Sequence, residues 1–113
     1  MYKPDRWQVI RIAPPEEAVF YKLLGGWYGN FVNGDSWRLN SGITEVKDQG
    51  NVFAVFGETG STYVCRKTEE GMSAYMDSVL YGLQQNAAER NVVITPITMK
   101  QYLNETKKSA PNP

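Results

Sequence analysis

The sequence of 113 residues contains no histidine and only one cysteine, Cys65. The absence of histidine excludes a Ser-His-Asp or Cys-His catalytic arrangement and a histidine-based zinc or iron site. One cysteine cannot form an internal disulfide, and a thiolate metal site needs several cysteines. Walker-type phosphate loops and dinucleotide fingerprints are also absent from the sequence. We therefore expect no metal and no cofactor, and we interpret Cys65 as an inert buried thiol in a strand.

The chain also lacks an excess of charge of either sign and any long apolar run. Its 12 basic residues balance its 12 acidic residues, which disfavours nucleic acid as a partner. No segment approaches the ~20 consecutive apolar residues of a membrane-spanning helix, and the N-terminus lacks the apolar segment of a signal peptide. The sequence therefore predicts a cytoplasmic protein with no membrane partner.

The hydrophobic content of 42% is close to the globular average, so the chain can bury one core without disulfides. We expect a single α+β domain over residues 1–108 and a flexible tail over residues 109–113.

Short runs of β-type residues separated by glycine turns dominate the middle of the chain. Residues 43–47, 52–56 and 62–67 are such runs, and turns this short between strands predict an antiparallel meander. Residues 6–12 are an expected first strand with Trp7 and Val9 on one side and Ile10 and Ile12 on the other. A late strand is expected over residues 92–95, before Pro96.

Three segments show helix signals. Residues 14–17 (Pro-Pro-Glu-Glu) resemble a helix start, an apolar stripe follows from Val19 to Trp27, and Gly25-Gly26 is the expected stop. Residues 73–89 predict the longest helix, and Thr98 with Gln101 forms a capping pattern for a short last helix. The expected fold class is α+β: a mainly antiparallel sheet (β-meander) with two or three helices on one face.

Two neighbouring segments supply candidate binding residues. In the first, Trp37 and Leu39 face one side of a strand, and Arg38 and Asn40 face the other. The polar residues either satisfy backbone groups of a turn or hold an anionic or amide-bearing ligand. The second is an aromatic, glycine-rich loop over residues 27–35, whose rings are either interface anchors or core residues. The predicted ligand- or partner-binding residues are Trp27, Tyr28, Phe31, Asp35, Arg38, Asn40 and Ser41.

Two functions stay open. The first is a binding or interaction module for a protein partner or a small ligand, possible as a homodimer through a half-exposed side formed by Tyr75, Tyr81 and Tyr102. The alternative is a small metal-independent enzyme with carboxylate or Arg/Ser/Asn chemistry in a cleft. No catalytic residue is assigned; the carboxylates considered are Asp35, Glu45, Asp48, Glu58 and Asp77.

The run from Trp37 to Ile43, together with Phe56-Gly57-x-x-Gly60-Ser61-x-Tyr63-x-Cys65, resembles a pattern in small uncharacterised proteins of bacterial mobile elements. These include proteins of integron gene cassettes and phage genomes. The resemblance implies a compact cytosolic α+β protein encoded as a stand-alone accessory gene. It implies no activity and no catalytic residue.

Overall fold

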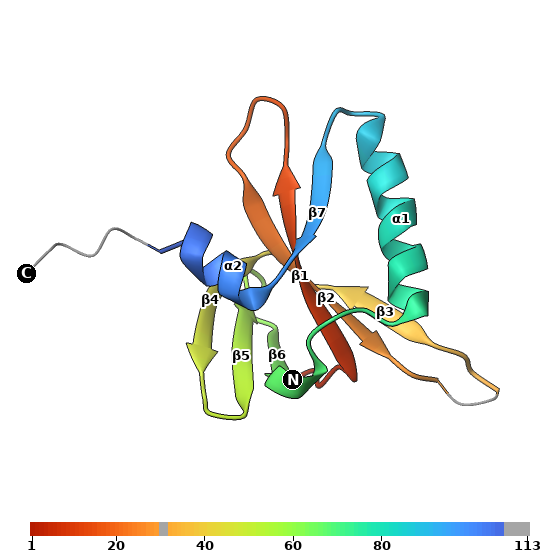
Figure 1. Ribbon diagram of the computed structural model, residues 1–113, viewed down its shortest axis with the longest axis vertical. Coiled ribbons are helices and arrows are strands. Elements are labelled where there is room, and N and C mark those ends of the chain that lie inside the picture. Colours follow the sequence, from red (N-terminus) through yellow and green to blue (C-terminus); the bar gives the residue numbers. More distant parts are fainter. Residues whose placement is uncertain (30–31, 108–113) are drawn as a thin grey trace, which may run out of the picture.

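The computed structural model describes residues 1–29 and 32–107. In this part of the chain, seven strands form two antiparallel sheets that pack with two α-helices (Figure 1). The fold is α+β with mainly antiparallel sheet, as the sequence predicts. The elements are β1 (Arg6–Ala13), β2 (Phe20–Trp27), β3 (Ser36–Leu39), β4 (Ile43–Asp48), β5 (Val52–Gly57), β6 (Thr62–Arg66), α1 (Ala74–Ala88), β7 (Val93–Ile97) and α2 (Met99–Glu105).

The strands divide into a four-stranded sheet of order β3-β2-β1-β7 and a three-stranded sheet of order β4-β5-β6. The three-stranded sheet is the predicted meander, and its turns carry Gly50 and Gly60 at positive φ. Each sheet buries one face against the other, and α1 covers the second face of the four-stranded sheet. The meander is thus a separate layer and does not continue the first sheet.

Strand β1 contributes to both hydrophobic cores. Trp7 and Val9 lie in the core between the two sheets, and Ile10 and Ile12 lie in the core under α1. This alternation confirms the two-sided burial predicted for residues 6–12. The core between the sheets is completed by Leu23, Val55, Tyr63, Cys65, Ile97, Met99 and Tyr102, and the core under α1 by Leu24, Met76 and Leu80.

The helix predicted between Pro14 and Trp27 is wrong, because this region contains strand β2. Leu23 packs between the sheets and Leu24 packs under α1, so neighbouring apolar residues serve opposite faces of a strand. Gly25 and Gly26, the expected helix stop, lie inside β2. A Cβ on Gly26 would lie 2.4 Å from the sulfur of Met76 on α1, so this glycine permits close packing of the helix on the sheet.

The capping pattern predicted for Thr98 is confirmed, and the predicted start of the longest helix at Ser73 is also a cap. Ser73 caps α1 through Met76 N (3.2 Å), and Thr98 caps α2 through Gln101 N (3.0 Å). Strand β7 continues through Pro96 to Ile97, which an edge strand allows because a missing N–H can face away from the ladder. The predicted tail at residues 109–113 lies outside the described residues.

The two helices lie against opposite faces of the four-stranded sheet, whereas the sequence places them on one face. Ile97 pairs with Val9 in the core between the sheets, and α2 begins two residues later, so it joins that core. An ion pair from Arg11 Nε to Glu105 Oε1 (3.2 Å) ties α2 to β1 on this side.

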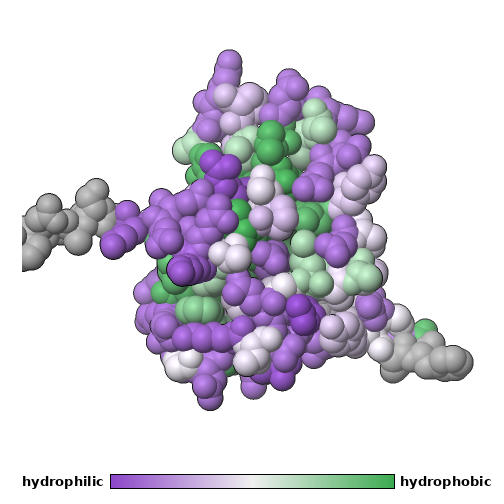
Figure 2. All heavy atoms as spheres, viewed as in Figure 1, coloured by the Kyte–Doolittle hydropathy of each residue, from purple (hydrophilic) through white to green (hydrophobic). Residues whose placement is uncertain are grey.

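The view in Figure 2 is mainly hydrophilic, with hydrophobic residues visible mostly in its upper half.

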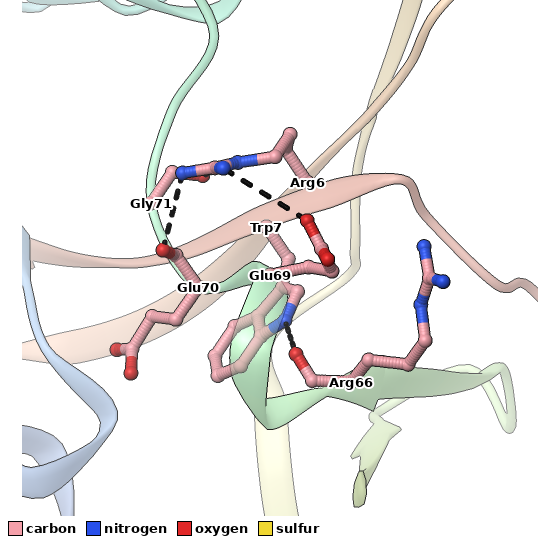
Figure 3. Close-up of polar contacts among 6 residues, drawn as sticks. All are labelled: Arg6, Trp7, Arg66, Glu69, Glu70 and Gly71. Atoms are coloured by element: carbon pink, nitrogen blue, oxygen red, sulfur yellow. Dashed lines mark hydrogen bonds and ion pairs between the residues drawn. The ribbon is translucent and has the colours of Figure 1, made fainter.

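Polar contacts at the start of β1 join the two sheets (Figure 3). The buried indole of Trp7 donates from Nε1 to the carbonyl oxygen of Arg66 at the end of β6 (2.7 Å). The neighbouring Arg6 donates from Nη2 to the carbonyl of Glu70 (3.2 Å) and lies 3.9 Å from the carboxylate of Glu69. The segment that connects the three-stranded sheet to α1 is therefore held directly against β1.

We expect Trp7→Phe to lower the free energy of unfolding by about 2–4 kcal/mol, because the smaller ring leaves a cavity and the carbonyl of Arg66 loses its donor. Urea unfolding followed by circular dichroism measures the change. Trp37→Phe is the matched control, since Trp37 is 41% exposed, and it should change stability by less than about 0.5 kcal/mol. Equal stability of the two variants would contradict the assigned role of Trp7.

Candidate functional site

The candidate site lies where the chain crosses from the first sheet to the second. Asn40 follows β3 and continues its pairing with β2: its backbone N–H donates to the carbonyl of Leu23 (3.0 Å), and its Oδ1 accepts from the N–H of Leu23 (2.8 Å). Gly42, at φ 140°, then turns the chain toward β4. The carbonyl of Gly42 accepts from the N–H of Glu58 (3.0 Å), which brings the β5–β6 turn against the crossing.

Two hollows adjoin at this crossing. The first, the polar hollow, has a volume of about 290 Å³. The second, the aromatic hollow, has a volume of about 250 Å³. Tyr2 and Arg38 line both hollows, and the guanidinium carbon of Arg38 lies 4.6 Å from the ring centre of Tyr2. The polar hollow is otherwise lined by Lys22, Leu39, Asn40, Ser41, Thr59, Ser61 and Tyr63, and the aromatic hollow by Trp27, Ser36 and Trp37.

The side-chain amide of Asn40 is the most unusual polar group in the polar hollow. Asn40 is 2% exposed, and Leu23 N–H, which can only donate, fixes Oδ1 on the side of β2. Nδ2 must therefore point the other way, where it is buried and has no hydrogen-bond partner among the described residues. A buried N–H donor without an acceptor is costly, so this position is suited to a bound acceptor atom.

Three polar atoms converge above Gly57, which has no Cβ. A Cβ there would lie 2.9 Å from Ser61 Oγ, 3.0 Å from Ser41 Oγ and 3.3 Å from Asn40 Nδ2. Glycine at this position therefore keeps the end of β5 open for these side chains.

The hydroxyl of Ser41 is held so that it can donate. Its Oγ accepts from the backbone N–H of Thr59 (3.1 Å) and lies 3.1 Å from Thr59 Oγ1, which donates to it. With both lone pairs of Oγ occupied, the hydroxyl hydrogen of Ser41 is left for another acceptor. This adds a second donor beside the amide of Asn40.

The charges around the polar hollow favour an anion. Arg38 and Lys22 are basic, no acidic residue lines the hollow, and neither Arg38 nor Lys22 forms an ion pair with another described residue. Burial raises the pKa of Tyr63 to about 12, although the nearby charge of Arg38 lowers it in part. The phenol of Tyr63 therefore stays protonated at neutral pH.

The structure brings together four of the seven predicted site residues. Arg38, Asn40 and Ser41 line the polar hollow, and Trp27 lines the aromatic hollow. Arg38 and Asn40, which the sequence places on one side, both line the polar hollow, and Leu39 packs against the core under α1. Trp37, which the sequence places on the side of Leu39, lines the aromatic hollow together with Arg38, so this part of the predicted alternation is wrong.

Of the remaining three residues, the two that the structure describes, Tyr28 and Asp35, do not join the site. Tyr28 is 58% exposed and lines neither hollow. The carboxylate of Asp35 accepts from the N–H of Gly29 (2.9 Å) across the β2–β3 connection, a structural contact. Phe31 lies outside the described residues.

Sequence reasoning missed Tyr2, Lys22, Thr59, Ser61 and Tyr63. Tyr2 reaches the site because its backbone pairs with the edge of β6, through Tyr2 N to the carbonyl of Thr62 (2.9 Å) and Val64 N to the carbonyl of Tyr2 (2.8 Å). This pairing spans about half the chain and has no local signal. The sequence predicts a turn at Glu58–Ser61, but it gives no sign that this turn contributes to the site.

The carboxylates considered for catalysis are not collected at either hollow. Asp48 contacts Lys67 Nζ (2.7 Å), and this hydrogen bond, with one from the Gly50 N–H, lowers the pKa of the exposed Asp48. Within residues 1–29 and 32–107, no three His, Cys, Asp or Glu side chains form a cluster that could hold a metal. Among the described helices, none has the length and apolar character needed to cross a membrane.

The proposed dimer surface needs correction. Tyr81 is 63% exposed, but Tyr102 is buried and packs edge-to-face on Tyr21 at 5.0 Å between ring centres. The apolar side of α2 belongs to the core between the sheets, so Tyr102 cannot form a surface with Tyr75 and Tyr81.

Comparison of the chain with protein-family models, curated proteins and solved structures gives no match. The resemblance to proteins of bacterial mobile elements therefore stays a prediction from the sequence.

Cys65 is fully buried, and burial, with a smaller contribution from the charge of Glu70, raises the pKa of its thiol from 9.0 to about 12. We expect iodoacetamide to modify native Cys65 at pH 8 at least tenfold more slowly than the urea-unfolded chain, as mass spectrometry measures. Because the unfolded thiol loses its proton first, the raised pKa makes stability fall as the pH rises from 9 toward 12. Cys65→Ala should reduce this fall, and rapid labelling of the native thiol would contradict the assignment.

Proposed function

We propose that this protein is a binding module for a small anionic ligand, a phosphate or a carboxylate, held in the polar hollow. The observation that carries the proposal is the buried Nδ2 of Asn40, which is oriented by the bond from Leu23 N–H to Oδ1 and lacks an acceptor in the described part of the chain. A ligand oxygen at this position would satisfy the donor and remove the cost of its burial.

The set of groups around Asn40 supports an anion in particular. The hydroxyl of Ser41 has a hydrogen left to donate, and Ser61 Oγ lies beside the same point above Gly57. Arg38 supplies a planar, permanently charged donor group at the wall, the geometry that best matches carboxylate and phosphate oxygens. Among the described residues, no acidic side chain lines the hollow, although the carboxylate of Glu58 lies nearby, against Gly42.

A protein partner remains the other sequence-based hypothesis for a binding module. The polar hollow favours a small ligand instead, because a buried, oriented amide recognises a single acceptor atom. The enzyme alternative gains no specific support, since Asp35 and Glu58 line neither hollow.

Arg38→Met should weaken the binding of inorganic phosphate about tenfold or more, because it removes the charge-assisted hydrogen bonds to the anion. The dissociation constant is measured by titration at low ionic strength, with chemical shifts as the readout. Arg90→Met is the matched control, since it changes the net charge equally at the exposed turn after α1, and it should leave affinity within twofold. If both variants bind phosphate equally weakly, the affinity depends only on net charge, phosphate is an adventitious ion, and the proposal fails.

Gly57→Ala should abolish measurable binding of phosphate and of acetate, since the new Cβ would displace Ser61 Oγ, Ser41 Oγ and Asn40 Nδ2. The hydroxyls can rotate away, so we expect a loss of stability of only about 1–2 kcal/mol. Gly82→Ala is the control, because a Cβ on Gly82 meets nothing within 4 Å. A Gly57→Ala variant that binds both anions as tightly as the natural sequence would refute the assignment of the site.

A further inference from the structure

Resting on the proposed function, we infer that the ligand carries a planar aromatic ring next to its anionic group. The anion occupies the polar hollow, and the ring occupies the aromatic hollow on the other side of Arg38. The chemical class is therefore an aryl or heteroaryl phosphate or carboxylate of small size.

The two hollows share a wall rather than lying on separate surfaces. Arg38 and Tyr2 line both, and the guanidinium group of Arg38 lies over the ring of Tyr2 at 4.6 Å. A guanidinium group held by a ring has its N–H donors directed outward in its own plane, which leaves them available to an anion. A ligand that crosses this wall therefore contacts Arg38 with both of its parts.

Aromatic groups form the other side of the second hollow. Tyr2 and Trp27 are in edge-to-face contact, with ring centres 6.3 Å apart at 66°. The indole of Trp27 is further held by its Nε1–H, which donates to the carbonyl of Lys3 (3.0 Å). Rings fixed in this way can receive the face or edge of a planar ligand without first losing conformational freedom.

The sizes of the hollows agree with a ligand that spans both. At about 290 and 250 Å³, neither reaches the roughly 300–1,000 Å³ typical of pockets for organic ligands. A bare phosphate or acetate ion would use the polar hollow alone. A ring linked to the anion would fill the neighbouring aromatic hollow as well.

The test compares phenyl phosphate with methyl phosphate, and phenylacetate with acetate, by isothermal titration calorimetry on the full chain. We expect the ring to tighten binding about tenfold in the pair whose anion the site prefers. Trp27→Leu should remove this ring preference and leave the affinity for methyl phosphate or acetate within twofold. Ser61→Ala should weaken both members of the pair equally, because it changes only the anion site.

Tyr28→Leu is the aromatic control, because Tyr28 is exposed and lines neither hollow, and it should keep the full ring preference. If Trp27→Leu unfolds, Trp37→Leu tests the aromatic hollow instead, because Trp37 lines this hollow and not the polar one. Equal affinity for ligands with and without the ring, both sensitive to Ser61→Ala, would overturn the inference and leave the anion site intact. Absence of binding by all four ligands would overturn both.

Discussion

The burial of β1 on both faces is the constraint on which the rest of this structure depends. Trp7 and Val9 need a cover on one face, and Ile10 and Ile12 need a cover on the other. Helix α1 supplies one cover and the three-stranded sheet supplies the second. The chain enters the three-stranded sheet by a first passage, from β3 to β4, and leaves it by a second passage, from β6 to α1. The indole of Trp7, bonded to the carbonyl of Arg66, fixes the distance between the sheets at the second passage.

The first passage creates the candidate site, since a chain that leaves a sheet also leaves unpaired backbone groups behind. In β2, the N–H of Leu23 would be one such group, and it donates to the side-chain oxygen of Asn40. The same bond directs the amide nitrogen to the opposite side, where residues 1–29 and 32–107 provide no acceptor for it. In Asn40, therefore, Oδ1 meets a requirement of the fold, and Nδ2 of the same side chain is available for recognition. Arg38 and Ser41, on either side in sequence, surround the amide with further donors.

The sequence predicts the elements whose signals are local. Alternation identifies β1, glycine turns identify the meander, and Ser73 and Thr98 mark the two helix starts. Strand β2 is misread because apolar neighbours such as Leu23 and Leu24 suit a helix stripe as well as a strand buried on both faces. Arg38, Asn40 and Ser41 are found because they lie within four positions of one another. Tyr2 reaches the site through pairing with β6 that no local pattern encodes, and Ser61 reaches it because the predicted β5–β6 turn contacts the distant Gly42.

The most direct test of this account follows the side-chain amide of Asn40 by ¹H–¹⁵N nuclear magnetic resonance during a phosphate titration. A ligand oxygen that accepts from Nδ2 should shift the Asn40 side-chain resonances in a saturable manner, together with Arg38 Nε. The backbone N–H of Leu23 should move little, because its bond to Oδ1 is kept. Resonances of Asn40 that stay fixed while phosphate saturates other groups would show that the buried amide is not a recognition group, and the central claim would fail.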